Sequence, residues 1–309
     1  QDVALAGYAL AALFLFFLSG YAAYRVRRFL LTRTLWRGIR FSQGGSAFAY
    51  ALRRLFLVAL TFVSLGLAYP FQVLFLWRYR YANTWYGDRK CTFGGRWRDI
   101  APVFHFHQFA WLAFLVALFY LIGSLPDSPG ASAMERMQND PRIFWVGGGG
   151  LLYFVFSLAH IRATIASRFL SRLRLGQASV QVRVPTLALF AQYVVHGLLF
   201  VVLGAIFLLV FGLVAASLPG GAIKNPQADL SRILQLGWTG MGALGLTYLA
   251  WLAFLAMAGE LVLRFGFWKL VVKGMRISGA RDLETVRARG EESALAGQGL
   301  ADALNVGAY

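Results

Sequence analysis

Cysteine and charge are both scarce in this chain of 309 residues, and each shortage excludes a class of protein. The single cysteine, Cys91, excludes an intramolecular disulfide and any multi-cysteine metal or cluster site. Charged residues make up only 14% of the sequence, whereas a soluble domain normally carries about 25%. The chain therefore cannot cover itself with a solvated surface.

Long apolar runs take the place of the missing charge, because 59% of the residues are hydrophobic. Runs of about 18 apolar residues or more are long enough to cross a bilayer as helices. We predict an all-α, polytopic integral membrane protein, with one membrane domain over residues 1–281 and a cytoplasmic tail over 282–309. The first run lacks the features of a cleaved signal peptide, so we expect it to remain in the protein. The six hydrophobic segments are Val3–Ala22, Leu55–Trp77, Phe109–Leu125, Phe144–Ile161 and parts of Val184–Leu218 and Leu236–Leu263.

The basic residues predict how these segments are oriented. The 30 Lys and Arg outnumber the 13 Asp and Glu, and most of them lie directly beside apolar segments. Positive-inside orientation and anionic lipid headgroups explain this placement, so we expect no nucleic-acid partner. The loops at 126–142 and 219–232 are nearly neutral, which places the basic segments and the C-terminus on the cytoplasmic side. These segments are Arg25–Arg54, Arg78–Arg98, Arg162–Arg183 and Arg264–Arg289.

The second segment, Leu55–Trp77, does not fit a simple crossing because arginines both precede and follow it. A crossing would place one arginine cluster outside, against the positive-inside tendency. Pro70 removes a helical hydrogen bond and disfavours helix at Tyr69. We therefore favour a re-entrant dip over a kinked span, which leaves five true spans rather than six. The bend is assigned to Gly66, Tyr69 and Pro70, and the flanking arginines are Arg53, Arg54, Arg78 and Arg80.

Four short segments resemble one another, and each combines a basic residue, an apolar residue and a glycine in close order. Their recurrence after apolar spans indicates an internal repeat. In the first, Leu31, Leu35 and Ile39 fall on one helical side at i, i+4 and i+8. We predict that each segment is an arginine-bearing interfacial helix that ends in a glycine turn. The segments are WRGIRFSQGG (36–45), DRKCTFGG (88–95), RLRLGQAS (172–179) and KGMRISGA (273–280).

The pattern LGLAYPFQ…RYRYANT…FGG, together with RGIRF, resembles the YjgN-like family of bacterial inner-membrane proteins. The C-terminal GQGLADALNVGAY is similar to that family as well, whereas Phe71 stands where the family usually has tryptophan. The resemblance covers most of the chain and implies a location in the bacterial inner membrane. The family's function is undefined, so the resemblance supplies no catalytic residue. The matching positions are Gly66, Tyr69, Pro70, Arg78, Tyr81, Asn83, Thr84, Phe93 and Gly94.

Few ionisable residues are candidates for chemistry. His105 and His107 lack an evident third ligand, so an interfacial pair is favoured over a metal site, and we predict no metal and no cofactor. His196 and Glu260 form a candidate intramembrane polar site, because ionisable groups inside a membrane are costly and often functional. The alternative for Glu260 is a helical ion pair with Arg264 at i+4. No catalytic triad, carboxylate pair or nucleotide loop is evident, so we expect no enzyme.

The stretch WRYRYANTWYGDRK (77–90) interleaves aromatic and basic residues. It serves either as an aromatic and positive-inside anchor or as a strip that binds phosphate through arginines, with Asn83 and Thr84 adding hydrogen bonds. We predict a non-enzymatic scaffold or accessory subunit of a membrane-protein complex that binds anionic lipid or a partner through such cytoplasmic strips. The alternative is a transporter or channel for a small or lipidic substrate, since repeats and broken segments occur in transporters. The predicted binding residues are Arg37, Arg40, Arg78, Arg80, Tyr81, Asn83, Thr84 and Trp85.

Overall fold

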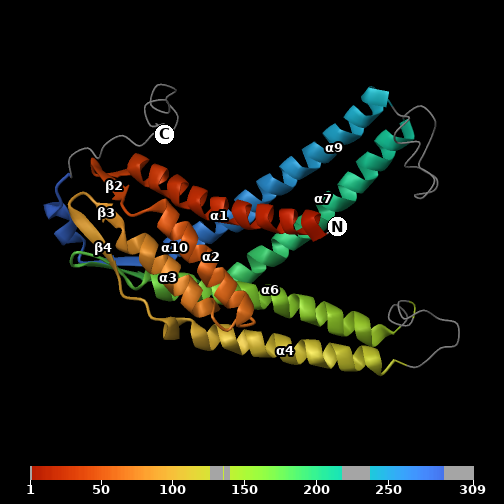
Figure 1. Cartoon of the computed structure of the whole chain (residues 1–309), viewed down its shortest axis with the longest axis horizontal. Coiled ribbons are helices and arrows are strands. Elements are labelled where there is room, and N and C mark those ends of the chain that lie inside the picture. The colour runs from red at the N-terminus through yellow and green to blue at the C-terminus, as the bar shows by residue number, and fades with distance from the viewer. Residues whose placement is uncertain (1, 126–134, 136–139, 218–236, 289–309) are drawn as a thin grey trace. The chain divides into compact units, whose positions relative to one another are not determined.

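The computed structural model describes residues 2–125, 135, 140–217 and 237–288 of the chain (Figure 1). Contacts between residues divide the chain into two units. Unit 1 comprises Gln1–Gly147, Thr164–Arg183 and Gly274–Tyr309, and unit 2 comprises Gly148–Ala163 and Val184–Lys273. Helix α6 (Pro141–Leu170) therefore gives its two ends to unit 1 and its middle to unit 2.

Long helices form most of the described chain, as the apolar runs predict. Within the described residues, five helices are long and apolar enough to cross a membrane. They correspond to the predicted segments other than the second, so five of the six segments are confirmed as long apolar helices. These helices are α1 (Asp2–Arg33), α4 (Ala101–Gly123), α6, α7 (Thr186–Ser217) and α9 (Gly237–Ala258), the last continued by η2 (Gly259–Phe265) and α10 (Gly266–Lys273).

The second predicted segment forms a helical hairpin. Helix α2 (Ala47–Val63) is followed by a turn over residues 64–68, and α3 (Tyr69–Ala82) returns beside α2 (Figure 1). The two open ends of the hairpin meet, because the N–H of Gly44 donates to the carbonyl of Asn83 at 2.9 Å. The predicted position of the bend is corrected: Pro70 lies in the first turn of α3, where it has no helical hydrogen bond to lose. Gly66, with φ of +91°, makes the turn itself.

The irregular backbone of this turn has polar partners from the neighbouring helices. Gln108 of α4 donates from Nε2 to the carbonyl of Leu65 at 2.7 Å. Thr61 of α2 donates to Oε1 of Gln72 of α3 at 2.7 Å, which ties the two arms together. Backbone that leaves the helical pattern is tolerated at membrane depth only with such protein partners.

Unit 1 also contains a seven-stranded antiparallel sheet, in which the strands are neighbours in chain order. The all-α prediction is therefore wrong. The prediction of interfacial basic helices is wrong too, because all four segments of the predicted repeat supply strands. The strands are β1 (Leu35–Trp36), β2 (Ile39–Gln43), β3 (Thr84–Tyr86), β4 (Arg89–Phe93), β5 (Leu173–Leu175), β6 (Ala178–Val182) and β7 (Met275–Ser278).

Two-residue turns explain why the basic segments form hairpins. Arg37–Gly38 joins β1 to β2, Gly87–Asp88 joins β3 to β4, and Gly176–Gln177 joins β5 to β6. The glycines in these turns all have positive φ, as turns that match the twist of paired strands require. Alternation within each strand then separates polar from apolar side chains, because successive residues of a strand point to opposite faces.

The register assigns one apolar and one polar face to the sheet, because directly paired residues lie on the same face. The apolar face packs against helix ends of unit 1. Phe93 of β4 meets the fully buried Phe169 of α6 edge to face, with ring centroids 5.3 Å apart, and Phe169 also contacts Trp77 of α3. The other face, called the polar face below, therefore points away from these helices. The apolar face includes Ile39, Phe41, Tyr86, Phe93, Leu173, Leu175 and Val182.

Residues 279–287, called the strap below, run past the three hairpin turns of the sheet and include the short helix η3 (Ala280–Thr285). Val286 is buried beside Gly87 and Ile39. The predicted tail at 282–309 thus begins within the strap, and residues 289–309 lie outside the described part. The strap contacts all three turns: Asp282 accepts from the N–H of Gln177 at 2.8 Å, Glu284 pairs with Arg37 at 3.7 Å, and Arg287 accepts through its carbonyl from the N–H of Asp88 at 3.0 Å.

Unit 2 consists of the middle of α6 with α7, α9, η2 and α10. Helices α7 and α9 lie side by side (Figure 1), and Phe207 of α7 stacks on Trp251 of α9 with centroids 4.8 Å apart. Arg162 of α6 lies over the ring of Phe267 at 4.3 Å and donates to the hydroxyl of Tyr193 at 3.0 Å. Most other large side chains of this unit are exposed and apolar, as expected of helices that face lipid.

Candidate functional site

Asn83 and Thr84, predicted to bind a headgroup, use their side chains to end helix α3. Asn83 donates from Nδ2 to the carbonyl of Tyr79 at 2.7 Å, and Thr84 donates from Oγ1 to the carbonyl of Arg80 at 2.9 Å. The last carbonyls of a helix have no partner within it, so these bonds stabilise the helix end. Both donors are occupied inside the protein, and Thr84 is buried.

Arg78, Arg80 and Tyr81 occupy the last turns of α3, and Arg78 is the exposed residue of the three. Arg80 lies over the ring of Trp77 at 5.6 Å. Tyr81 is covered by Arg27 of α1, whose guanidinium carbon is 4.9 Å from the ring centroid. Arg78 is exposed. This helix therefore offers one arginine from the predicted set.

Arg37, Arg40 and Trp85 belong to the sheet. Arg37 lies in the β1–β2 turn and pairs with Glu284 of the strap. Arg40 and Trp85 lie on the polar face, where the ammonium of Lys90 is 5.5 Å from the Trp85 ring centroid. The predicted strip is thus divided between the end of α3 and the polar face of the sheet.

A further group of arginines lies near the helix ends that meet the sheet in unit 1. At 1.5 Å per helical residue, these arginines are within about 12 Å of those ends. Four have an aromatic ring below the guanidinium: Arg53 lies over Tyr79 at 4.3 Å, Arg54 over Phe16 at 4.7 Å, Arg98 over Trp97 at 5.4 Å and Arg78 over Phe75 at 6.0 Å. None of the group forms an ion pair with a carboxylate of the described residues. The group, called the arginine belt below, consists of Arg25, Arg53, Arg54, Arg78 and Arg98.

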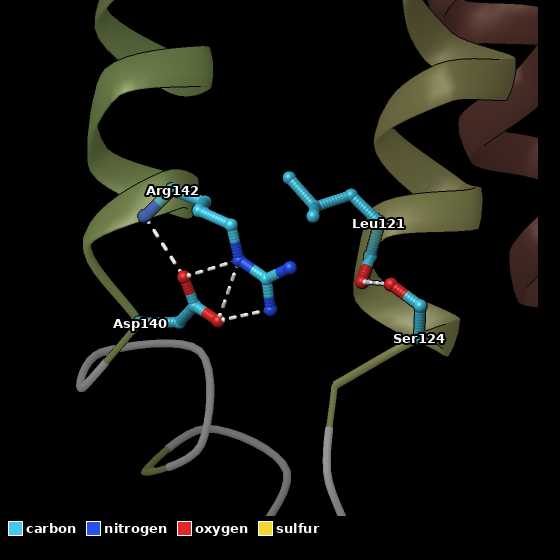
Figure 2. A network of polar contacts seen from close by, with 4 residues as sticks. All are labelled: Leu121, Ser124, Asp140 and Arg142. Carbon is cyan, nitrogen blue, oxygen red and sulfur yellow. Dashed lines mark hydrogen bonds and ion pairs between the residues drawn. The ribbon is translucent and has the colours of Figure 1, made fainter.

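The far ends of α4 and α6 show the opposite arrangement. Figure 2 shows Arg142 in contact with Asp140, with Nη2 and Oδ2 2.7 Å apart. Asp140 also accepts from the N–H of Arg142 at 2.8 Å and so caps α6, while Ser124 donates to the carbonyl of Leu121 at the end of α4. Hydrogen bonds from Arg142 lower the pKa of the Asp140 carboxyl, which keeps it ionised. The arginine at this end is therefore neutralised, whereas the belt is not.

The candidate intramembrane site is only partly assembled. Glu260 and Arg264 form an ion pair at 3.0 Å across one turn of η2, and both side chains are exposed. His196 of α7 faces the same segment, since a Cβ at Gly259 would lie 3.9 Å from its Cε1. The ion pair with Arg264 agrees with the alternative hypothesis that Glu260 forms a helical ion pair.

His105 and His107 lie within the first two turns of α4. His105 Nδ1 lies 3.0 Å from Oε1 of Gln108, one turn along α4. His107 is buried. In the part of the chain that the structure describes, no three His, Cys, Asp or Glu side chains are grouped as a metal ion would require.

The match of the sequence to a known family extends over nearly all of these elements. Residues 1–303 match the model of DUF898, described as a bacterial protein of unknown function. The chain belongs to the DUF898 family. Membership confirms the predicted resemblance to a bacterial family of undefined function. No curated protein and no solved structure matches this DUF898 protein.

Cys91 gives this DUF898 protein a direct probe of the sheet. Burial on the apolar face raises the pKa of its thiol to about 11, although nearby Arg27 opposes the rise. Between about pH 9 and 11 only the unfolded chain releases this proton, so the free energy of unfolding falls as the pH rises through that window. At pH 8 we expect iodoacetamide to alkylate Cys91 about 100-fold more slowly in the folded protein than in denaturant, because the thiolate fraction changes tenfold per pKa unit. Equal rates measured by mass spectrometry would contradict the burial of this strand.

Proposed function

We propose that this DUF898 protein is a non-enzymatic protein of the bacterial inner membrane that binds anionic phospholipid headgroups through the arginine belt. In this role it serves as a scaffold or accessory subunit of a larger membrane assembly. The observation that supports the proposal most strongly is the belt itself, five arginines near the helix ends that meet the sheet, without a carboxylate partner among the described residues. Guanidinium groups bind phosphate through paired hydrogen bonds, and aromatic rings favour the headgroup level.

The helices support the placement in a membrane. Five helices have the length and composition of spans. The tip of the α2–α3 hairpin is apolar and open, with Val63 84% and Leu65 87% exposed, so it is stabilised by apolar surroundings. We propose that the hairpin dips into the bilayer from the side of the sheet, and that this side is cytoplasmic because it carries the unneutralised arginines.

Transport, the alternative considered from the sequence, has less support. It was based on the predicted repeat and the broken second segment, and it would use His196 and Glu260 as an intramembrane polar site. The ion pair between Glu260 and Arg264 favours a structural role for that carboxylate. The DUF898 protein is therefore proposed as a lipid-binding membrane component rather than a carrier.

The test of lipid binding is the preference for phosphatidylglycerol over phosphatidylcholine in reconstituted vesicles. Brominated lipids quench tryptophan fluorescence on contact, and Trp97 lies within the belt. We expect the wild type to prefer phosphatidylglycerol. The belt variant R53Q/R78Q/R98Q should lose about tenfold or more of that preference, since each basic residue at an anionic surface contributes about 1 kcal/mol.

The matched control is the face variant R40Q/R174Q/R276Q, which removes the same charge from the polar face of the sheet. It should keep the wild-type lipid preference, because those arginines point away from the helices. Unchanged preference in the belt variant would refute the proposal. An equal loss in both variants would show that net charge, rather than the belt, attracts the lipid.

A further inference from the structure

The polar face of the sheet carries a row of cations. Arg40 lies on β2, Lys90 on β4, Arg174 on β5 and Arg276 on β7, and all four are exposed. The register Trp85–Lys90, Thr92–Arg174 and Gln181–Arg276 shows that they share this face. With strands about 4.8 Å apart, the row from β2 to β7 is about 24 Å wide.

These cations have no anionic partner within the described protein. The guanidinium groups of Arg40, Arg174 and Arg276 form no ion pair or hydrogen bond with described residues, and Lys90 contacts only the Trp85 ring. None of the seven strands contains Asp or Glu. The nearby Asp282 and Glu284 belong to the strap, where they are engaged with Gln177 and Arg37 at the turns.

The surroundings of this face decide what it can bind. The apolar face packs on the helix ends of unit 1, so the polar face points away from those helix ends. Single-stranded nucleic acids are normally bound by stacking their bases on several aromatic rings. Among the described strand residues, Trp85 is the one aromatic ring on this face, and Lys90 already lies over it. The chemistry that complements the row is an extended run of carboxylates.

We propose that the polar face of the sheet docks an acidic segment of a soluble partner protein, whose carboxylates pair with Arg40, Lys90, Arg174 and Arg276. Thr92, Ser179 and Ser278 lie on the same face, where their hydroxyl groups are hydrogen-bonded within the sheet, so the cations carry the proposed recognition. This inference goes beyond lipid binding and uses none of the residues of the arginine belt. The sheet thereby links a membrane-bound body to a partner outside the bilayer.

The test measures the binding of fluorescein-labelled poly-L-glutamate to the purified full chain in a neutral detergent, by fluorescence anisotropy. We expect saturable binding that weakens as salt is added. The face variant R40Q/R174Q/R276Q should bind about tenfold more weakly, because three exposed ion pairs of a few tenths of a kcal/mol each combine to about that factor. The belt variant R53Q/R78Q/R98Q, matched in charge, should bind as the wild type does.

Three results would overturn this proposal: wild-type affinity in the face variant, an equal loss in the belt variant, or displacement of the peptide by single-stranded poly(dT) more readily than by unlabelled polyglutamate. Unchanged unfolding midpoints serve as the folding control. If the triple variant does not fold, Arg174→Glu tests the same point with one exposed substitution. Loss of peptide binding in the face variant, with its lipid preference unchanged, would support the docking proposal independently of lipid binding. The two proposals can therefore be refuted separately.

Discussion

Cysteines introduced at Gly44 and at Gly94 are expected to react with a membrane-impermeant maleimide from the same side of the membrane. The α2–α3 hairpin begins just after Gly44 and leads through β3 and β4 to Gly94. Its arms are 17 and 14 residues long, which gives about 25 and 21 Å at 1.5 Å per residue. A bilayer core is about 30 Å thick, so neither arm crosses it alone. The hydrogen bond between Gly44 and Asn83 holds the start of α2 and the end of α3 together, so the chain enters and leaves the hairpin at the same end.

Both positions accept a side chain. A Cβ at Gly44 meets nothing within 4 Å, and one at Gly94 lies 3.8 Å from the nearest atom, the carbonyl oxygen of Arg172. Cys91 is replaced by serine so that it does not contribute. Gly123→Cys, at the far end of α4, provides the opposite-side control, because α4 is long enough to cross. Labelling of the Gly44 and Gly94 cysteines from different sides would establish a true crossing of the second segment.

Gly87→Ala should destabilise unit 1 by about 3 kcal/mol. Gly87 has φ of +53°, a left-handed conformation that costs other residues about 1–2 kcal/mol. An added methyl group would also collide with the carbonyl oxygen of Arg287 and approach Val286. The strap would then move away, and exposing a buried valine costs about 1.5–3 kcal/mol. The measurement is the free energy of unfolding in detergent, followed by the fluorescence of the tryptophans in unit 1.

A series of three alanine substitutions separates the two contributions. Gly38→Ala, in the β1–β2 turn at φ of +77°, meets nothing within 4 Å and should cost only the backbone strain. Gly44→Ala has neither strain nor collision and should be nearly neutral. Hydrogen exchange at the N–H of Asp88, which donates to Arg287, should accelerate in Gly87→Ala alone. Equal losses for Gly38→Ala and Gly87→Ala would mean that the strap does not stabilise the sheet.

Some features of this protein follow directly from the sequence. The shortage of charge and the long apolar runs predict membrane helices, because water solvates such apolar surfaces poorly. Arginines on both sides of the second segment, with a proline inside it, predict a segment that turns back. The turn lies a few residues earlier than expected, because proline is well placed at a helix start and glycine makes the sharper turn.

The sheet could have been inferred from the glycine turns in the basic segments, but the helical spacing of the apolar residues led to a prediction of helices. Leu31, Leu35 and Ile39 fit a helical spacing, but α1 ends between the first two of them. The sequences WRGI, YGDR and LGQA each hold a two-residue turn with glycine between strands of two to five residues. Strands this short have little periodicity of their own, and they are stabilised by neighbours far away in the chain. The belt was missed for a similar reason, since its arginines come from separate helices, whose ends meet only in the folded protein.

The order of the strands has a consequence for biosynthesis. Each hairpin emerges between two hydrophobic helices, and each new strand adds to the one before it, so the sheet can grow in step with translation and insertion. The strap comes last and contacts a turn from every hairpin. The growing chain therefore lacks the strap until after its last strand has been made, and termination before residue 280 leaves the three hairpin turns without these contacts.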